Sequence, residues 1–143
     1  MIIRPATSKD IPHIIDLALN MATRYPGLRP DKNKIKTIVA KSITSPACYT
    51  MALEAEGKLR GCLIAIVQPH TWAERQVAHI VLWVSEVPSG GVRLLRDFVL
   101  WLAPRRGIRL AGYTPDFEWD PRIGKLLIRA GFTRHGGSFL FYN

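Results

Sequence analysis

The sequence predicts an α/β fold with a mixed, mostly antiparallel central sheet flanked by about four helices. The first reason is the order of the elements, because apolar runs of strand length alternate with stretches of helical spacing as β, α, α, β, β, β, α, β, α, β. The second is that only one β–α–β unit, from Ile80 to Tyr113, requires a parallel pair of strands. The third is size, since 143 residues with 48% hydrophobic and 22% charged side chains fit a single domain over residues 1–143.

The first third of the chain supplies one strand and two helices. Residues 1–4 are expected to form a short strand, and Pro12 fits only the first turn of the helix that follows. The apolar face of that helix consists of Ile11, Ile14, Ile15, Ala18, Met21 and Ala22. Tyr25-Pro26-Gly27 stops it, and a second helix is expected from Asp31 to about Thr44. The residues of the second helix that are expected to face inward are Ile35, Ile38, Val39 and Ile43.

The remaining elements outside the central stretch are two hairpins, a strand and a helix. Strands over 49–55 and 59–67 are joined by a turn at 54–58, and a loop over 68–75 carries His70 and Trp72. After the central stretch, a strand is expected over 108–113 and a loop over 114–120. The last helix and hairpin are marked by Pro121 at the helix start, Gly131 at its end and a turn at Gly136-Gly137.

Residues 78–107 predict a strand, a glycine turn and a helix. Ile80 to Val84 form the strand, Pro88 to Gly91 break it, and the helix stops near Pro104 and Gly107. The helical stripe consists of Leu94, Leu95, Phe98, Val99 and Leu102. Such a joint directs free backbone N–H groups and a positive helix terminus at one point, which suits a phosphate or pyrophosphate, and Arg93 could add charge. The alternative is a purely structural turn that needs a positive φ.

The net charge of +9 attracts an acidic partner such as nucleic acid, an anionic cofactor or an acidic protein. No basic–aromatic ladder is present, so a phosphate-bearing ligand is favoured over nucleic acid. No apolar run approaches the ~20 residues of a membrane span, and the first ten residues lack a signal-peptide core, so we expect a cytoplasmic protein without membrane contact. Cys48 and Cys62 belong to no CxxC or Cys/His group and are expected to be buried free thiols.

Four stretches, in this order and spacing, carry a resemblance to a known family. They are Ile3 to Thr7 with Asp10, Glu56 to Gly61, Trp83 to Leu95, and Ala130-Gly131-Phe132. Over nearly its whole length the chain resembles the GNAT superfamily of acyl-CoA-dependent N-acetyltransferases. The resemblance implies transfer of an acetyl group from acetyl-CoA to a primary amine, on a sheet splayed near Trp83, and it implies no metal.

The resemblance also assigns the coenzyme A contacts and the side from which the amine enters. The strand residues that would pair with the pantetheine arm are Leu82, Trp83 and Val84. The residues that would surround the pyrophosphate with backbone N–H groups are Ser89, Gly90, Gly91, Val92 and Arg93. The amine would enter from the opposite side of the sheet, near the first helices and the loops at 68–75 and 114–119.

Two positions depart from the family pattern. Val87 stands where the phosphate loop usually has Arg or Gln. Leu127 stands where many members have a tyrosine that protonates the leaving thiolate. The usual general acid is therefore missing, and Tyr113 and Tyr142 are candidates to replace it, with packing in the core or at its rim as the alternative role.

Acetyl transfer needs a base, because an alkylammonium with a pKa near ~10 must lose a proton before it can attack a thioester. The candidate bases are His79, Glu86, Glu118 and Asp116. The ordinary pKa of histidine, ~6.5, suits this task, although His79 could instead be hydrogen-bonded at a sheet edge. Glu86 could equally be a loop carboxylate that faces water.

Three hypotheses follow from the sequence. The first is an active acetyl-CoA-dependent N-acetyltransferase acting on a small-molecule amine, a lysine or a protein N-terminus. The second, prompted by Leu127 and the altered phosphate loop, is a protein of the same fold that binds coenzyme A or a partner without turnover. The third is a basic nucleic-acid-binding module. The oligomeric state is left open, with a homodimer among the alternatives.

Overall fold

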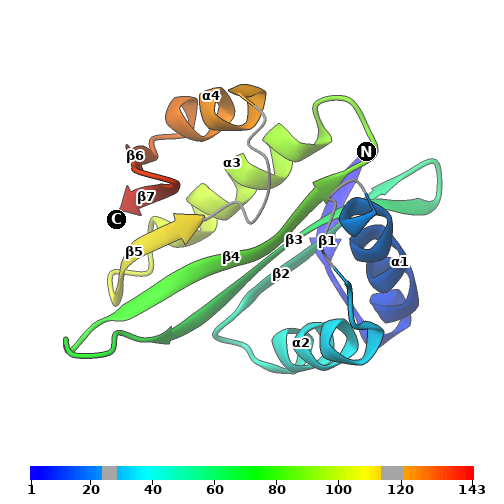
Figure 1. Cartoon of the computed structure of the whole chain (residues 1–143), viewed down its shortest axis with the longest axis horizontal. Helices are drawn as coiled ribbons and strands as arrows, with labels where there is room; N and C mark the ends of the chain where they lie inside the picture. Colours follow the sequence, from blue (N-terminus) through cyan, green and yellow to red (C-terminus); the bar gives the residue numbers. More distant parts are fainter. Residues whose placement is uncertain (24–28, 114–120) are drawn as a thin grey trace.

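The computed structural model describes residues 1–23, 29–113 and 121–143, and within these ranges it has one sheet with helices on both faces (Figure 1). The strands are β1 (Ile2–Pro5), β2 (Tyr49–Ala55), β3 (Lys58–Pro69), β4 (Gln76–Ser85), β5 (Ile108–Tyr113), β6 (Thr133–His135) and β7 (Ser138–Tyr142). The helices are the 3-10 turn η1 (Ser8–Asp10), α1 (Ile11–Ala22), α2 (Lys32–Thr44), α3 (Gly90–Leu102) and α4 (Pro121–Arg129).

The sheet is mixed and mostly antiparallel, as the sequence predicts. Its strand order is β1-β2-β3-β4-β5-β7-β6. β4 and β5, which α3 connects, are paired in parallel. Every other neighbouring pair of the described strands is antiparallel. The parallel pair follows from the β–α–β unit formed by β4, α3 and β5, because a parallel partner can be reached only by a crossover.

A nearly buried carboxylate fixes the start of α1 to the sheet. The two carboxylate oxygens of Asp10 accept hydrogen bonds from Nη1 and Nη2 of Arg4 at 2.8 and 2.9 Å. The backbone N–H of Thr7 donates to the same carboxylate at 2.8 Å. Nε of Arg4 also lies 3.1 Å from Oε2 of Glu54 on β2. The Arg4–Asp10 pair therefore joins β1, η1 and β2 where α1 begins.

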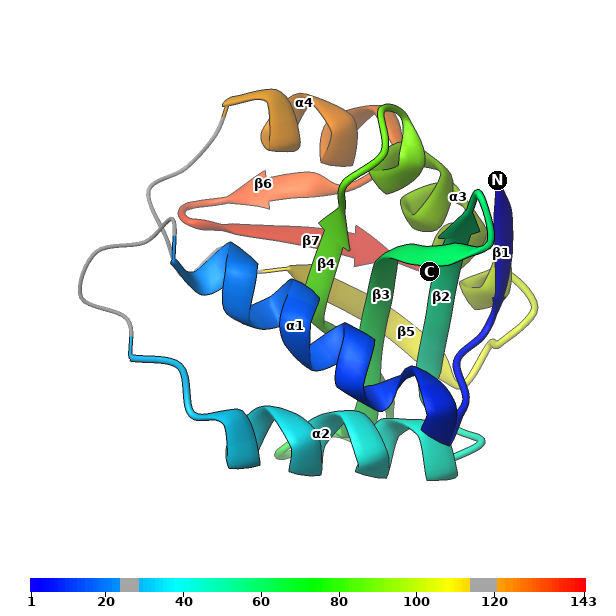
Figure 2. The same ribbon diagram turned by 90° about the vertical axis from the view of Figure 1, so that its right-hand side faces the viewer.

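Helices α1 and α2 cover one face of the sheet (Figure 2). Asp31 caps α2, since its Oδ1 accepts from the backbone N–H of Asn33 and Lys34 at 2.9 and 3.1 Å. The apolar cluster on this face contains Ile14, Leu17, Ala18, Val39, Ala52, Cys62, Ile64 and Leu82. The predicted inward stripes are confirmed except at Ile38, whose side chain is 43% exposed.

Helix α3 covers the opposite face, together with α4. The predicted stripe of α3 is buried at Leu94, Leu95, Phe98 and Leu102, while Val99 is partly buried. These residues share one cluster with Leu53, Leu63 and Ile80 of the sheet and with Leu127 of α4. On this face Tyr49 donates a hydrogen bond to Oδ2 of Asp97 at 2.7 Å, which ties β2 to α3.

Several sequence predictions need correction. β3 runs on to Pro69, and β4 begins at Gln76, so only residues 70–75 remain of the predicted loop. Gly90 and Gly91 form the first turn of α3 instead of a separate break. Cys48 is a free thiol but only partly buried, whereas Cys62 is fully buried. The predicted helix stop at 25–27 and the predicted loop over 114–120 both lie outside the described residues. Among the described helices, none combines the length and apolarity that crossing a membrane requires.

Candidate functional site

β4 and β5 part near the middle of the sheet. Their parallel pairing ends where His79 lies opposite Gly112. Beyond this point β4 continues from Ile80 to Ser85 and pairs with β3 alone among the described residues. The edge of β4 that faces away from β3 therefore carries backbone N–H and C=O groups without a strand partner. The opening begins before Trp83, four residues earlier than the position that the sequence indicates.

A cavity of about 230 Å³ lies on the β4 side of this opening. Its walls come from four elements, namely the end of β4, the first turn of α3, one face of α1 and one face of α4. The residues that line it include Met21, Trp83, Val84, Gly91, Ile123 and Leu126. The cavity therefore connects the α1 side of the sheet with the beginning of α3.

The turn between β4 and α3 is closed by its own hydrogen bonds. Oγ of Ser85 donates to the carbonyl of Val87 at 3.0 Å and accepts from the Val87 N–H at 3.1 Å. The N–H of Gly90 donates to the same carbonyl at 3.0 Å. A Cβ at Gly90 would overlap Oγ of Ser85, so glycine is required there by close packing. The positive φ of the turn, 63°, belongs to Ser89 and not to a glycine.

The first turn of α3 leaves two backbone N–H groups available. The N–H of Arg93 bonds the carbonyl of Ser89, and that of Gly90 is held inside the turn. For Gly91 and Val92 no acceptor is found among the described residues, as expected for the first turn of a helix. A Cβ at Gly91 would meet Trp83 at an ordinary distance of 3.5 Å, so the backbone is accessible without being crowded. This terminus suits an anionic group.

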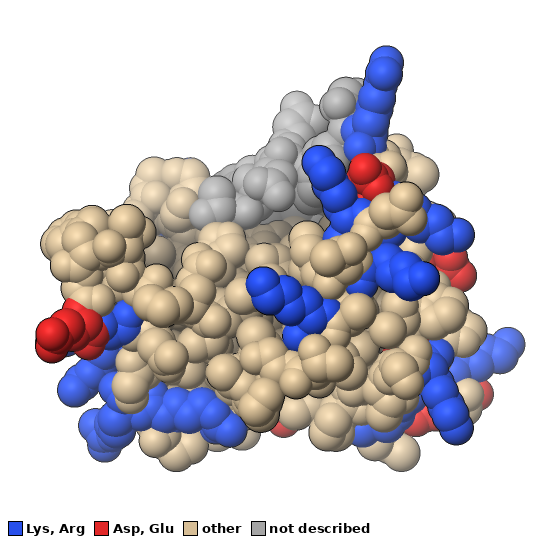
Figure 3. Space-filling model, turned by 90° about the horizontal axis from the view of Figure 1, so that it is seen from below, with Lys and Arg blue, Asp and Glu red and all other residues tan. Residues whose placement is uncertain are grey.

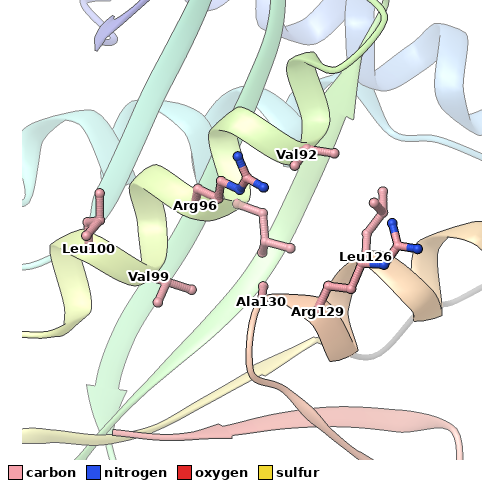
Figure 4. A pocket seen from close by; sticks show the side chains of 8 residues that line it. Val92, Arg96, Val99, Leu100, Leu126, Arg129 and Ala130 are labelled. Carbon is pink, nitrogen blue, oxygen red and sulfur yellow. The ribbon is translucent and has the colours of Figure 1, made fainter.

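A second and larger cavity lies between α3 and α4 (Figure 4). It has a volume of about 440 Å³ and shares Leu126 with the first cavity. Val92, next to Gly91, lies in its wall. Two guanidinium groups stand at its edges, Arg96 from α3 and Arg129 from α4 (Figure 4). The two cavities together offer an apolar path that leads past a helix N-terminus to two cations.

Two candidate catalytic residues lie at the opening. His79 is exposed and sits at the point where the two strands part. Because Ala78 and Ile80 point into the cluster beneath α3, strand alternation places His79 on the face that α1 and α2 cover. Tyr113 is the last residue of β5, and its ring contacts Trp83 edge to face. The structure thus places both residues beside the point where the strands part, with His79 on the α1–α2 face and Tyr113 against the cluster beneath α3.

The other candidates do not join this group. Glu86 lies past the end of β4, seven residues or roughly 20 Å of strand from His79, with its carboxylate 3.3 Å from Nε of Arg60. The hydroxyl of Tyr142 lies 3.3 Å from Nε2 of His135, and Tyr142 pairs with Leu110 at the far end of β5. Asp116 and Glu118 lie outside the described residues. Leu127, at the position of the missing acid, is fully buried in the core.

No three His, Cys, Asp or Glu side chains gather as possible metal ligands within the described ranges. The groups at the opening and along the two cavities are backbone N–H groups, aromatic rings, a histidine and arginines, which are suited to anion binding and proton transfer.

Three solved acetyltransferases resemble this chain in structure. The ribosomal-protein-alanine N-acetyltransferase of Brucella melitensis shares 14% identity, with all of both chains covered and a TM-score of 0.76. A GNAT family acetyltransferase of Streptococcus pneumoniae shares 14% identity over 97% of this chain and 95% of that chain, with a TM-score of 0.74. A GNAT family acetyltransferase of Brucella melitensis in complex with acetyl-CoA shares 18% over 99% and 86%, with a TM-score of 0.69.

The chain has the GNAT fold. No protein-family model matches it, and no curated protein matches it in sequence. The likeness to the GNAT fold is therefore carried by the arrangement of the elements, at identities too low to transfer individual residues.

Several residues that line the two cavities were not predicted from the sequence. Met21 and Ile123 were assigned to the apolar faces of their helices, and Arg96 and Arg129 to no site. A signal for Arg96 exists, because it follows Val92 by four residues and so extends the same face of α3 from the phosphate turn. Arg129 gave no such signal, since its place depends on how α4 packs beside α3.

Proposed function

We propose that the protein is an N-acetyltransferase that uses acetyl-CoA and a primary amine. The observation that carries this proposal is the parting of β4 from β5 beside the free N-terminus of α3. The extended pantetheine arm of acetyl-CoA could pair with the unpartnered edge of β4, while the pyrophosphate of the cofactor lies at the N–H groups of Gly91 and Val92. The likeness in fold to an acetyltransferase in complex with acetyl-CoA supports acetyl-CoA as the cofactor.

The proposed cofactor site extends the set that the sequence indicates. Backbone contacts would come from Leu82, Trp83 and Val84 on β4 and from Ser89 to Arg93 in the turn and helix. Arg96 and Arg129 would supply cations for further phosphate oxygens along the groove between α3 and α4. Val87, which replaces an arginine or glutamine of the family pattern, has its N–H and carbonyl occupied inside the turn. The charge that the turn lacks would thus be provided by the groove.

In the proposed reaction, acetyl-CoA supplies the acetyl thioester and the acceptor amine attacks its carbonyl carbon. His79, on the α1–α2 face, would accept a proton from the acceptor ammonium, directly or through water. A backbone N–H on the free edge of β4 would donate to the thioester oxygen as negative charge develops there. As the C–S bond breaks, the Tyr113 hydroxyl would protonate the leaving sulfur, in place of the acid that Leu127 cannot supply, and the second proton lost by the attacking nitrogen would return to the tyrosine oxygen through water.

One observation favours a second candidate function, which is coenzyme A binding without turnover. Leu127 is fully buried, so the position of the usual acid contributes only to the core. The acceptor remains a proposal too: the ribosomal-protein-alanine N-acetyltransferase neighbour favours a protein amine, and small amines are the alternative. The cytoplasmic location belongs to this proposal, and nucleic acid is not among the partners that we propose.

Incubation with radiolabelled acetyl-CoA and a panel of amines and peptides tests the proposal. We expect transfer of label that depends on the acceptor. Saturable binding of acetyl-CoA without transfer to any acceptor would favour the second candidate. Absence of both binding and transfer would contradict both candidates.

A further inference from the structure

A small apolar pocket opens on the α1–α2 face of the sheet. It has a volume of about 90 Å³ and is enclosed by α1, α2, β3 and β4. The lining side chains that matter here are Ala18, Ile35, Ile38, Ile64, Val81 and Leu82. Two of them remain exposed to solvent, Ile38 at 43% and Val81 at 41%. Helix α2 thus leaves an apolar residue uncovered at the pocket, although its other faces carry lysines.

A β-bulge creates one wall of this pocket. Opposite β3, the pairing of β4 passes from Ile80 to Leu82 and leaves Val81 without a partner. Strand alternation is interrupted there, so Val81 and Leu82, although consecutive, both line the pocket. Bulges of this kind redirect side chains beside active sites, and this one lies two residues after His79.

The pocket lies next to the opening that we assign to the reaction. Ala18 lines the pocket and Met21 lines the opening, and they are one turn apart on α1, or about 5 Å. Leu82 lines the pocket and Val84 the opening, one strand repeat or roughly 7 Å apart. An amine in the opening would therefore place the substituent on its neighbouring carbon within reach of the pocket.

The volume and lining of the pocket restrict what can enter it. All of its lining residues are apolar, so a charged or strongly polar group would lose hydration there without gaining a partner. An apolar cavity that binds benzene measures roughly 150 Å³, whereas this pocket measures about 90 Å³. An aliphatic side chain of about four heavy atoms fits these limits better than an aromatic ring.

The rim of the pocket is positively charged. Lys34 and Lys41 lie four residues before and three residues after Ile38, so both flank it on the same side of α2. Both lysines are exposed, whereas the carboxylate of Asp31 on this helix is used as the N-cap. Figure 3, the view from the side on which α2 lies, shows many more Lys and Arg than Asp and Glu side chains. The positive charge of this rim favours a substrate that carries negative charge.

We propose that this pocket binds the side chain of the acceptor, so that the acceptor is an α-amine beside an aliphatic side chain and followed by an anionic group. The inference rests on the proposed function and specifies its substrate class. The anionic group can be the carboxylate of a free amino acid such as leucine or methionine, or the acidic residues of a peptide that begins with one of them. Lys34 and Lys41 would bind either group.

Acetyl transfer to a matched panel tests the proposal. The panel contains free leucine and methionine, and peptides that begin Met-Asp-Glu, Leu-Asp-Glu, Ser-Asp-Glu, Trp-Asp-Glu and Met-Lys-Lys. We expect kcat/KM for the aliphatic acidic acceptors to exceed that for the serine, tryptophan and lysine-bearing peptides by about tenfold or more. The comparison of peptides with free amino acids identifies the source of the anionic group. Equal rates across the panel would overturn the proposal.

Three substitutions on α2 locate the effect. Ile38→Trp, at a partly exposed position, should fill the mouth and raise KM for the aliphatic acceptors about tenfold without changing coenzyme A binding. Lys34→Glu should raise KM for acidic acceptors, whereas Lys36→Glu, on the opposite side of α2, is the matched control and should not. Unchanged KM values in Ile38→Trp and Lys34→Glu would contradict the assignment.

A binding measurement separates failure of this inference from failure of the proposed function. Fluorescence anisotropy of labelled Met-Asp-Glu and Met-Lys-Lys peptides, with the label at their C-termini, is recorded on protein saturated with coenzyme A. Selective binding that Ile38→Trp abolishes, without any acetyl transfer, would leave the pocket assigned and contradict the acetyltransferase. Transfer without selectivity, or no selective binding, would overturn the pocket.

Discussion

The ring of Trp83 on β4 meets the ring of Tyr113 on β5 edge to face, with 5.7 Å between their centroids, across the opening where the two strands part. The indole N–H of Trp83 also donates to the carbonyl of Gly91 at 3.0 Å. The side chain of Trp83 on β4 thus contacts both β5 and the first turn of α3. A ligand that enters the opening must lie against Trp83.

Trp83 should therefore report coenzyme A binding. We expect titration with coenzyme A to change the intrinsic fluorescence of the wild type, because the indole environment changes when the opening is filled. Trp83→Phe should lose most of this change, whereas Trp101→Phe, at a residue stacked on Phe98 away from the opening, should keep it. A full signal in Trp83→Phe would show that the ligand binds elsewhere.

His79 and Tyr113 should affect kcat more than coenzyme A binding. If His79 accepts the amine proton, His79→Gln should lower kcat by roughly 10²- to 10⁴-fold. Tyr113→Phe keeps the ring contact with Trp83 and removes only the hydroxyl, so a loss of kcat would identify that hydroxyl as the acid. His13→Gln, in the exposed first turn of α1, is the control. Wild-type kcat in both site variants would remove both residues from the mechanism.

Asp10 should make stability depend on acid pH. The hydrogen bonds from Arg4, with a smaller contribution from the Thr7 N–H, lower the pKa of Asp10 from 3.8 to about 2. Because the folded-state pKa lies below the ordinary one, this stabilisation is complete above about pH 4 and is lost as the pH falls towards 2. Asp10→Asn should reduce the free energy of unfolding at pH 7 by on the order of 2 kcal/mol. Urea denaturation at pH 7, 4 and 3 checks this, and a difference that does not narrow between pH 4 and 3 would contradict it.

The two cysteines should differ in reactivity. Burial raises the pKa of Cys62 to about 12, so the fraction of its reactive thiolate at pH 8 is very small. Cys48 is partly exposed. A chromogenic thiol reagent at pH 8 should therefore modify about one thiol in the native protein and two after denaturation. Cys48→Ser should show almost no reaction until it unfolds, and rapid reaction of native Cys48→Ser would contradict the burial of Cys62.

Local patterns in the sequence were enough to predict the sheet and the joint between β4 and α3. Asp31, Pro12 and Gly131 end or begin their helices for reasons that lie within a few residues of each, and Gly131 has the expected positive φ of 103°. The stripe from Leu94 to Leu102 is buried because it has a helical period. The fold class was predictable for the same reason, since one β–α–β unit sets the one parallel pair found in the described part of the sheet.

Features that depend on pairing between distant segments could not be predicted. The bulge at Val81 and the parting after His79 arise from register with β3 and β5, and no residue of β4 encodes them by its type. Ile38 has the spacing of a core residue, but its side chain stays 43% exposed and lines the small pocket between α2 and the sheet. The alternative interpretation of the turn, a positive φ at a glycine, is wrong for Gly90, since contact with Ser85 requires glycine there and the positive φ belongs to Ser89.

Calorimetric titration of wild type, Gly91→Ala, Gly91→Glu and Arg93→Ala with acetyl-CoA measures whether coenzyme A is held at the first turn of α3. Gly91→Ala should bind nearly as the wild type does, because a Cβ there would lie 3.5 Å from Trp83, an ordinary van der Waals distance. Gly91→Glu adds negative charge to the helix terminus and should weaken binding tenfold or more, or by about 1.4 kcal/mol. Arg93→Ala should weaken binding less than Gly91→Glu does, and its effect should become smaller still in high salt. If Gly91→Glu, shown by circular dichroism to be folded, binds acetyl-CoA like the wild type, the coenzyme is not held by this turn and the account is wrong.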